Sequence, residues 1–236
     1  MKILVINPNT NPKNSRVIEK AIKPFTPANC TVDVVNPEKG PLGLESNYHN
    51  FMAAVETHKM IKKAEEQGYD GIVIACYGDP GIEAAKELVN IPVVGITEAS
   101  YALAPMLGSK FLILVSADTA VPRQVRYLKT LGISDHLYAI KPLGVDIIGI
   151  MSDLVNAKEL IANNAGKLLK ETGSEVIVMG CSGFSGMRTD LQKYLNIPII
   201  DPVVAGVQLC STLINMKLAQ SKVNMYKIPP EFEIKE

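Results

Sequence analysis

The sequence contains an internal repeat, and each copy places a cysteine at the same point. Residues 65–78 read EEQGYDGIVIACYG, and residues 170–183 read KETGSEVIVMGCSG. Cys76 in the first copy corresponds to Cys181 in the second, at a spacing of 105 residues. The repeat therefore predicts two related half-domains that hold these cysteines at equivalent positions.

The repeat extends to both sides of the cysteine segments. NIPVV at 90–94 recurs as NIPII at 196–200 with a shift of 106, and the opening KILVI at 2–6 recurs more loosely as KFLILV at 110–115. If the half-domains face each other across a cleft, the two thiols approach one substrate from opposite sides. One thiolate then removes a proton and the other thiol returns one to the opposite face. This arrangement predicts a racemase or epimerase.

The length of the chain allows either one large domain or two lobes, because 236 residues exceed the usual domain size. The repeat favours two lobes. We expect an N-terminal α/β lobe over 1–105 and a C-terminal α/β lobe over 106–205. A helix and tail over 206–236 are expected to pack back on the N-terminal lobe.

The charge balance limits the kinds of partner that we expect the protein to bind. Lys and Arg together number 24, as do Asp and Glu, so the composition gives no basic footprint for nucleic acid or an anionic membrane. The sequence shows no signal peptide and no apolar run long enough to span a membrane. We expect a cytoplasmic protein that acts on a small molecule, with no nucleic-acid or membrane partner.

The cysteines do not form a metal or disulfide pattern. Cys30, Cys76, Cys181 and Cys210 include no Cys-x-x-Cys pair and no Cys/His cluster. The chain also lacks a glycine-rich phosphate loop of the Walker or dinucleotide type. We therefore predict no metal site and no cofactor.

Short β-branched runs alternate with segments of helical period along the whole chain. The predicted strands are Ile3–Ile6, Cys30–Val35, Gly71–Ala75, Val93–Gly95, Phe111–Val115, Leu137–Ile140, Val176–Met179 and Ile199–Ile200. The predicted helices are Ser15–Ile22, Met52–Gln67, Gly81–Val89, Ala99–Leu107, Val121–Leu131, Ala157–Thr172 and Gly186–Leu195. This alternation predicts an α/β fold in which each of two pseudo-symmetric lobes has a mostly parallel sheet flanked by helices, with the active site in the cleft between them.

Cys76 and Cys181 each follow the last apolar residue of a predicted strand, at the sheet edge where α/β proteins bind ligands. A helix follows each cysteine, and the positive end of a helix favours a thiolate. Most buried cysteines are inert, and that interpretation holds for Cys30 and Cys210. For Cys76 and Cys181, shared ancestry alone would explain the symmetry, but the matched positions favour a catalytic pair.

A proton-transfer site also needs donors for the enolate that forms when the proton leaves. The candidates near the cysteines are Tyr77, Gly78, Ser116, Thr119, Ser182 and Gly183. Gly and Ser in such turns also serve the backbone alone. Asn7 and Asn9 end the first strand, where they either orient polar groups of the substrate or cap the next helix. Asp79 has the same two interpretations.

With these residues assembled, the chain resembles the hydantoin racemase branch of the aspartate/glutamate racemase superfamily. The matching segments are Ile6–Thr10, Gly40-Pro41 with Glu45 and Tyr48, Ala75-Cys76 with Gly78–Gly81, Gly180-Cys181 with Gly183, and Ile197–Val203. The resemblance implies two pseudo-symmetric lobes, no cofactor, a homo-oligomer, and Cys76 and Cys181 as the proton-transfer residues. It also implies a 5-substituted hydantoin or allantoin as substrate.

The departures from the superfamily concern the substrate. Amino-acid racemases follow their first cysteine with Asn-Thr and their second with Thr, whereas this chain has Tyr77-Gly78 and Ser182-Gly183. That difference argues against free aspartate or glutamate. Within the hydantoin branch, the run ending in Phe184 is bulkier than usual, and His49 follows Tyr48 where an acidic residue is common. We include Tyr48 and Phe184 among the expected substrate contacts.

Two kinds of alternative function stay open at this point. One is another reaction on the same scaffold: an aspartate/glutamate-type amino-acid racemase, or another cysteine-dependent isomerase or decarboxylase of the superfamily. The other is a non-enzymatic protein that binds a small metabolite and uses its cysteines structurally. The presence of a cysteine in both half-domains favours racemisation.

Overall fold

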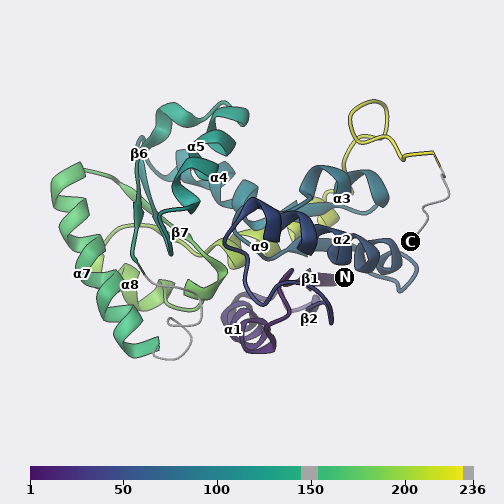
Figure 1. Cartoon of the computed structure of the whole chain (residues 1–236), viewed down its shortest axis with the longest axis horizontal. Helices are drawn as coiled ribbons and strands as arrows, with labels where there is room; N and C mark the ends of the chain where they lie inside the picture. Colours follow the sequence, from purple (N-terminus) through teal and green to yellow (C-terminus); the bar gives the residue numbers. More distant parts are fainter. Residues whose placement is uncertain (145–153, 231–236) are drawn as a thin grey trace.

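Two parallel β-sheets form the centre of the molecule (Figure 1). The computed structural model describes residues 1–144 and 154–230. The strands are β1 (Lys2–Ile6), β2 (Thr31–Val35), β3 (Gly71–Ile74), β4 (Val93–Gly95), β5 (Phe111–Val115), β6 (Leu137–Pro142), β7 (Val176–Gly180) and β8 (Ile199–Ile200). The strand orders are β2-β1-β3-β4 and β6-β5-β7-β8. The second sheet thus repeats the connectivity of the first, and the predicted α/β fold with two parallel sheets is confirmed.

The helices are α1 (Pro12–Ile22), α2 (Asn47–Ala64), α3 (Ile82–Leu88), α4 (Ile96–Leu107), α5 (Ala120–Thr130), α7 (Leu154–Thr172), α8 (Arg188–Leu195) and α9 (Pro202–Asn215). Side-chain caps mark the start of α1, α2 and α9. Ser46 caps α2 by accepting a hydrogen bond from the His49 N–H at 3.1 Å, so this helix begins five residues before the predicted Met52. Asn11 and Pro12 likewise start α1 before the predicted Ser15.

The two sheets share one core. In the first sheet, Ile3 and Val73 belong to a core that also includes residues of the second sheet, while their neighbours Leu4 and Ile72 pack with α2 and α3. The second sheet follows the same alternation, with one face toward the shared core and the other toward α7 and α8. Because the inner faces belong to one apolar cluster, the lobes are packed against each other rather than joined by a linker.

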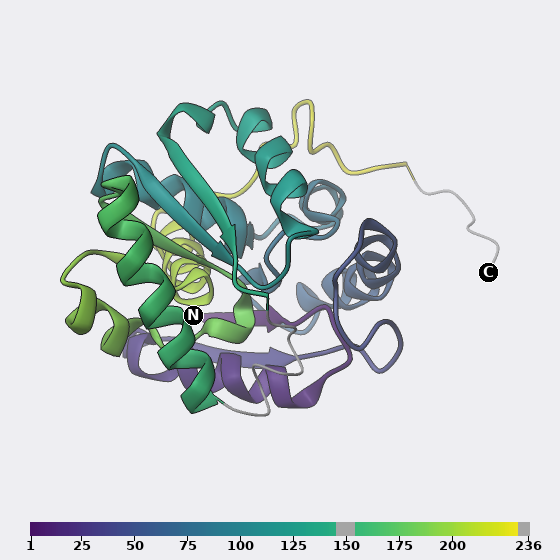
Figure 2. The same ribbon diagram turned by 60° about the vertical axis from the view of Figure 1, so that its left-hand side comes forward.

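The helices α4 and α9 pack across the two lobes. The helix α4 follows the first sheet in sequence but contacts β7 and β8 of the second. The helix α9 follows the second sheet but packs on β1, β3 and β4 of the first, and α4 and α9 also contact each other. Figure 1 shows α9 between the sheets, and Figure 2 shows the two sheets from a second direction. The lobe bounds 1–105, 106–205 and 206–236 themselves stay a prediction.

The chain after α9 lies along the outer strand of the first sheet. The Gln220 side-chain amide donates to the Val93 carbonyl and accepts from the Val93 N–H, both at 2.9 Å. The Lys222 ammonium donates to the Lys86 carbonyl at 2.6 Å. Residues 231–236 of the predicted tail lie outside the described residues. Within the described ranges, no helix combines the length and apolar character that a membrane crossing requires.

Candidate active site

Each cysteine lies in a loop that leaves the carboxyl end of a central strand. Cys76 follows β3, and Cys181 follows β7 directly. Both strands are fully buried, so their ends are fixed by the sheets on either side. Cys181 is buried and Cys76 is partly buried. The equivalent positions predicted from the repeat thus correspond to equivalent strand ends.

The Cys181 thiol has several hydrogen-bond donors around it. The Gly183 N–H donates to its Sγ atom at 3.4 Å. Burial raises the pKa of Cys181 to about 11, and the Gly183 N–H, the Ser116 hydroxyl and the Phe184 N–H all act to lower it. These donors would stabilise a thiolate at this position.

The Cys76 thiol is in a less favourable environment for a thiolate. Burial raises its pKa above the ordinary value, and the nearby Cys181 and Asp79 raise it further. Arg123, on α5 of the second lobe, acts in the opposite direction. Cys181 therefore lies near enough to raise the pKa of Cys76, and Cys181 is the more readily ionised of the two.

Polar contacts join the two lobes beside the cysteines. The Asn14 amide, on α1, donates from Nδ2 to the Ser182 hydroxyl at 3.4 Å. The Glu45 carbonyl accepts hydrogen bonds from Arg123 at 2.9 Å and from the Thr119 hydroxyl at 3.4 Å. These bonds connect segments more than 70 residues apart, so they fix the two lobes relative to each other, and the bond from Asn14 reaches the Cys181 loop directly.

Asn7 and Asn9 are buried and bonded mainly to their own segment. The Asn7 amide donates to the Asn9 Oδ1 atom at 2.9 Å and to the Ser15 hydroxyl at 3.0 Å. Asn9 also accepts from the Asn11 N–H at 2.9 Å. The network fixes the turn into α1 and places Asn14 next to Ser182.

Gly78 and Asp79 bond to the start of α4. The Gly78 N–H donates to the Thr97 hydroxyl at 2.6 Å, so this N–H is already occupied. Asp79 accepts from the N–H groups of Thr97 and Glu98 at 2.9 and 2.8 Å. Burial and the nearby Glu98 raise the pKa of Asp79 to about 7, although the two N–H bonds act to lower it. Asp79 thus caps α4 and not the next helix, α3, which has Gly81 at its N-cap, and its role as a substrate contact stays a prediction.

The remaining predicted contacts differ in exposure. Tyr48, on α2, is 70% exposed, whereas Phe184 is fully buried in the core of the second lobe. Tyr77 is partly buried and packs edge-on against Tyr101, with ring centroids 5.9 Å apart. Thr119 is exposed. The structure thus brings together Cys76, Cys181, Ser116, Ser182 and Gly183, and the roles of all these residues as substrate contacts stay predictions.

Two residues of the site carried no signal in the sequence. Asn14 lies inside α1, and Arg123 lies inside α5. Within the described ranges, the buried Oδ1 atom of Asn14 accepts no hydrogen bond. A buried carbonyl without a donor is unfavourable unless a bound molecule supplies one. Only the packing of α1 against the second lobe places Asn14 at the cysteines.

A cavity of about 400 Å³ opens beside the Cys76 loop. It is lined by Asn47, Asn50, Phe51, Gly78, Arg123, Gln124, Arg126 and Tyr127. Gly78 is two residues from Cys76, and the other lining residues come from α2 and α5. The cavity therefore provides room beside the Cys76 loop, between residues of the two lobes.

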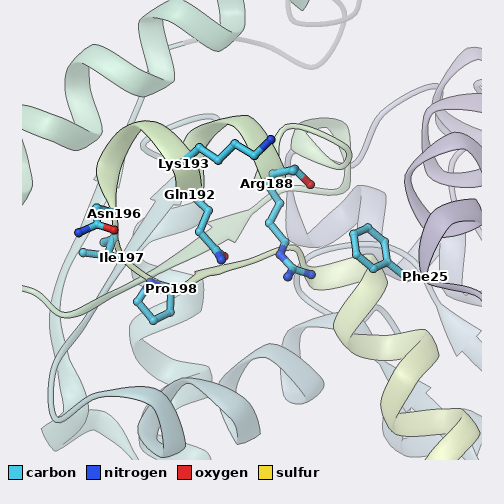
Figure 3. A pocket seen from close by; sticks show the side chains of 8 residues that line it. Phe25, Arg188, Gln192, Lys193, Asn196, Ile197 and Pro198 are labelled. Carbon is cyan, nitrogen blue, oxygen red and sulfur yellow. The ribbon is translucent and has the colours of Figure 1, made fainter.

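A second cavity, of about 570 Å³, lies along α8, away from the cysteine loops (Figure 3). The Arg188 guanidinium stacks over the Phe25 ring at 5.0 Å in this cavity. Its lining includes no residue of either cysteine loop. Among the described residues, no group of three or more His, Cys, Asp or Glu side chains is arranged to hold a metal ion.

The raised pKa of Cys181 gives a testable pH dependence. Because the thiolate is the reactive form and the pKa is about 11, alkylation of Cys181 by iodoacetamide should accelerate about tenfold per pH unit between about pH 7 and pH 10. Mass spectrometry of the labelled peptide gives the rate. A rate that levels off below about pH 9, as for an ordinary exposed thiol, contradicts the expected raised pKa.

Comparisons with known proteins identify the relatives of this chain. A family model described as Asp/Glu/Hydantoin racemase matches residues 3–210. A hydantoin racemase from Pseudomonas sp. (strain NS671) is 35% identical, over 99% of this chain and 94% of that protein. The solved structure of allantoin racemase from Klebsiella pneumoniae superposes with a TM-score of 0.97 at 31% identity, over 100% of this chain and 96% of that one. Allantoin racemase from Pseudomonas fluorescens gives a TM-score of 0.94 at 28% identity, over 100% of both chains.

The family model spans both cysteine loops and both sheets, and the similarity to the hydantoin racemase extends over nearly the full length of both proteins. The chain therefore belongs to the Asp/Glu/Hydantoin racemase family, and it is an isomerase of the racemase type.

Proposed function

We propose that the protein is a two-cysteine racemase that needs no cofactor and inverts the C5 stereocentre of a cyclic ureide. The substrate class is a 5-substituted hydantoin or a related ring such as allantoin. The observation that carries the proposal is the pair of thiols at equivalent strand ends, near enough for Cys181 to raise the pKa of Cys76.

The proposed reaction transfers one proton out and one proton in. A cysteine thiolate takes the C5 proton and becomes a thiol, while the C5–H electron pair moves into the ring as an enolate. The opposite thiol then donates its proton to the other face of C5 and becomes the thiolate. We assign Cys181 as the thiol that ionises first, because the Gly183 N–H and the Ser116 hydroxyl favour its thiolate.

The polar groups beside the cysteines suit a ureide. A ureide ring presents N–H donors and carbonyl acceptors, and the free Oδ1 atom of Asn14 is a buried acceptor next to Ser182. The Ser182 hydroxyl keeps a proton to donate, because it accepts the bond from Asn14. Relatives described as hydantoin racemase and allantoin racemase support the same substrate class. We place the C5 substituent toward the cavity beside Gly78.

The test follows single enantiomers of a small panel of 5-substituted hydantoins, with allantoin, in deuterated buffer. Polarimetry measures loss of optical rotation, and mass spectrometry measures deuterium at C5. We expect at least one ring to lose rotation while it gains one deuterium. Free aspartate and glutamate serve as controls, and racemisation of these amino acids without turnover of any ureide would overturn the substrate assignment.

A further inference from the structure

A buried carboxylate fixes the Cys76 loop to the start of α4. Asp79 lies three residues after Cys76 and is 2% exposed. Its two oxygens accept the N–H groups of Thr97 and Glu98, the second and third residues of α4. The hydroxyl of Tyr127, on α5 of the other lobe, also donates to this carboxylate at 3.1 Å. Asp79 thus connects the loop, the helix and the opposite lobe.

A second buried carboxylate fixes the Cys181 loop to the start of α9. Asp201 is also 2% exposed, and it caps α9 by accepting the Val203 N–H at 3.0 Å. The same carboxylate accepts the Ser185 hydroxyl and the Gly186 N–H, both at 2.9 Å. Ser185 and Gly186 belong to the loop that begins at Cys181. Asp201 therefore joins the loop to the helix, as Asp79 does in the first lobe.

Each lobe has the same contact between a cysteine loop and the start of a helix, but the carboxylate belongs to the loop in the first lobe and to the helix start in the second. The 106-residue shift of the repeat aligns Asp201 with Gly95, which precedes α4. Asp79, by contrast, belongs to the cysteine loop itself. A Cβ atom on Gly95 would lie 2.2 Å from the Asp79 Cγ atom. A side chain at residue 95 would therefore enter the space that the Asp79 carboxylate occupies.

We propose that Asp79 and Asp201 are positioning residues that perform the same task in the two lobes, each holding one cysteine loop against a helix N-terminus. The proposal rests on the two-cysteine proton transfer proposed above. Proton transfer from carbon requires a closely defined distance, and a displacement of about 1 Å lowers the rate about 100-fold. The first lobe places its carboxylate in the loop and glycine at the helix, and the second lobe places its carboxylate at the helix.

The sharpest test exchanges Asp79 and Gly95 in the first lobe. Asp79→Gly removes the carboxylate without backbone strain, because residue 79 has a φ of +44° and glycine adopts this conformation readily. We expect kcat to fall about 100-fold with little change in KM. Gly95→Asp alone places two carboxylates in one space and should be at least as slow. The double variant, Asp79→Gly with Gly95→Asp, moves the carboxylate to the position of Asp201 and should recover kcat at least about tenfold over Asp79→Gly.

A readout without turnover separates this proposal from the proposed function. The alkylation rate of Cys76, measured relative to Cys181 in the same molecule, should change in both single variants and return toward the wild-type ratio in the double variant. Asp79→Asn keeps the size of the side chain and should shift the pH profile of Cys76 alkylation to lower pH, because the charge that raises the Cys76 pKa is gone. Asp201→Asn is the matched variant in the second lobe and should change the alkylation rate of Cys181 relative to that of Cys76.

The outcomes are distinct. Recovery in the double variant, in kcat and in the alkylation ratio, supports the proposal. A double variant with a kcat no higher than that of Asp79→Gly overturns it, as does an Asp79→Asn variant with unchanged kcat and an unchanged pH profile of Cys76 alkylation. If the wild type racemises no ureide, the proposed function fails, while the alkylation ratio still decides whether these carboxylates position the cysteines.

Discussion

Replacing either Cys76 or Cys181 with serine is expected to lower racemisation about 1,000-fold or more, because a serine hydroxyl ionises far less readily than a thiol and a general acid or base contributes about 100- to 10,000-fold. Each variant should nevertheless keep slow C5 exchange for one enantiomer only, the one whose C5–H faces the remaining cysteine. The two variants should show opposite enantiomer preferences. Deuterium incorporation into separated enantiomers measures this preference.

The other cysteines supply the control. Cys30 is partly buried and lies outside both cysteine loops, so Cys30→Ser should keep the wild-type rate. If Cys76→Ser or Cys181→Ser racemised at the wild-type rate, a two-cysteine mechanism would be excluded. Equal exchange of both enantiomers by one single variant would mean that one thiol reaches both faces of the ring.

Gly180→Ala is expected to destabilise the second lobe. Gly180 ends β7, directly before Cys181, and a Cβ atom there would lie 2.7 Å from the Leu114 carbonyl oxygen and 2.8 Å from a Val115 methyl group. Overpacking of this kind lowers the free energy of unfolding by about 1–3 kcal/mol. Thermal unfolding should show a fall in Tm of roughly 2–12 °C. Since β7 must shift away from β5, Cys181 moves and kcat should fall as well.

The repeat provides a matched control for this substitution. Ala75 lies 105 residues before Gly180 and is fully buried ahead of Cys76, so the first lobe accepts a methyl group at the equivalent position. Ala75→Gly should leave the position of Cys76 nearly unchanged and alter Tm less than Gly180→Ala does. A larger loss of activity in Ala75→Gly would contradict the steric explanation.

The sequence predicts the strands well because the repeat and the alternation of apolar runs act locally. All eight predicted strands are present, and Cys76 and Cys181 lie at strand ends as the pattern indicated. Helix starts are less well predicted: caps such as Ser46 extend a helix beyond its apolar pattern. The local signal thus places the cysteines along the chain but does not set the surroundings that tune their ionisation.

The contacts between lobes could not be predicted from local patterns. No short segment of the sequence indicates that α4 and α9 cross between the sheets. The same is true of the approach of Asn14 to Ser182. The sequence left Asp79 either as a cap of the next helix or as a substrate contact, whereas its bonds to Thr97 and Glu98 cap α4, which lies further along the chain. These features depend on how two finished lobes pack, which is a property of the whole chain.

The two thiols have unlike surroundings, but the equilibrium between mirror-image substrates limits how far the proposed enzyme can distinguish them. Cys181 has hydrogen-bond donors that lower its pKa, whereas Cys76 lies near an acidic side chain that raises it. For a ring with one stereocentre, the two enantiomers have equal free energy, so the equilibrium constant between them is one. The Haldane relation then requires equal kcat/KM for both enantiomers, however different the two thiols are. The asymmetry of the site can appear only as paired differences, in which the enantiomer with the higher kcat also has the proportionally higher KM.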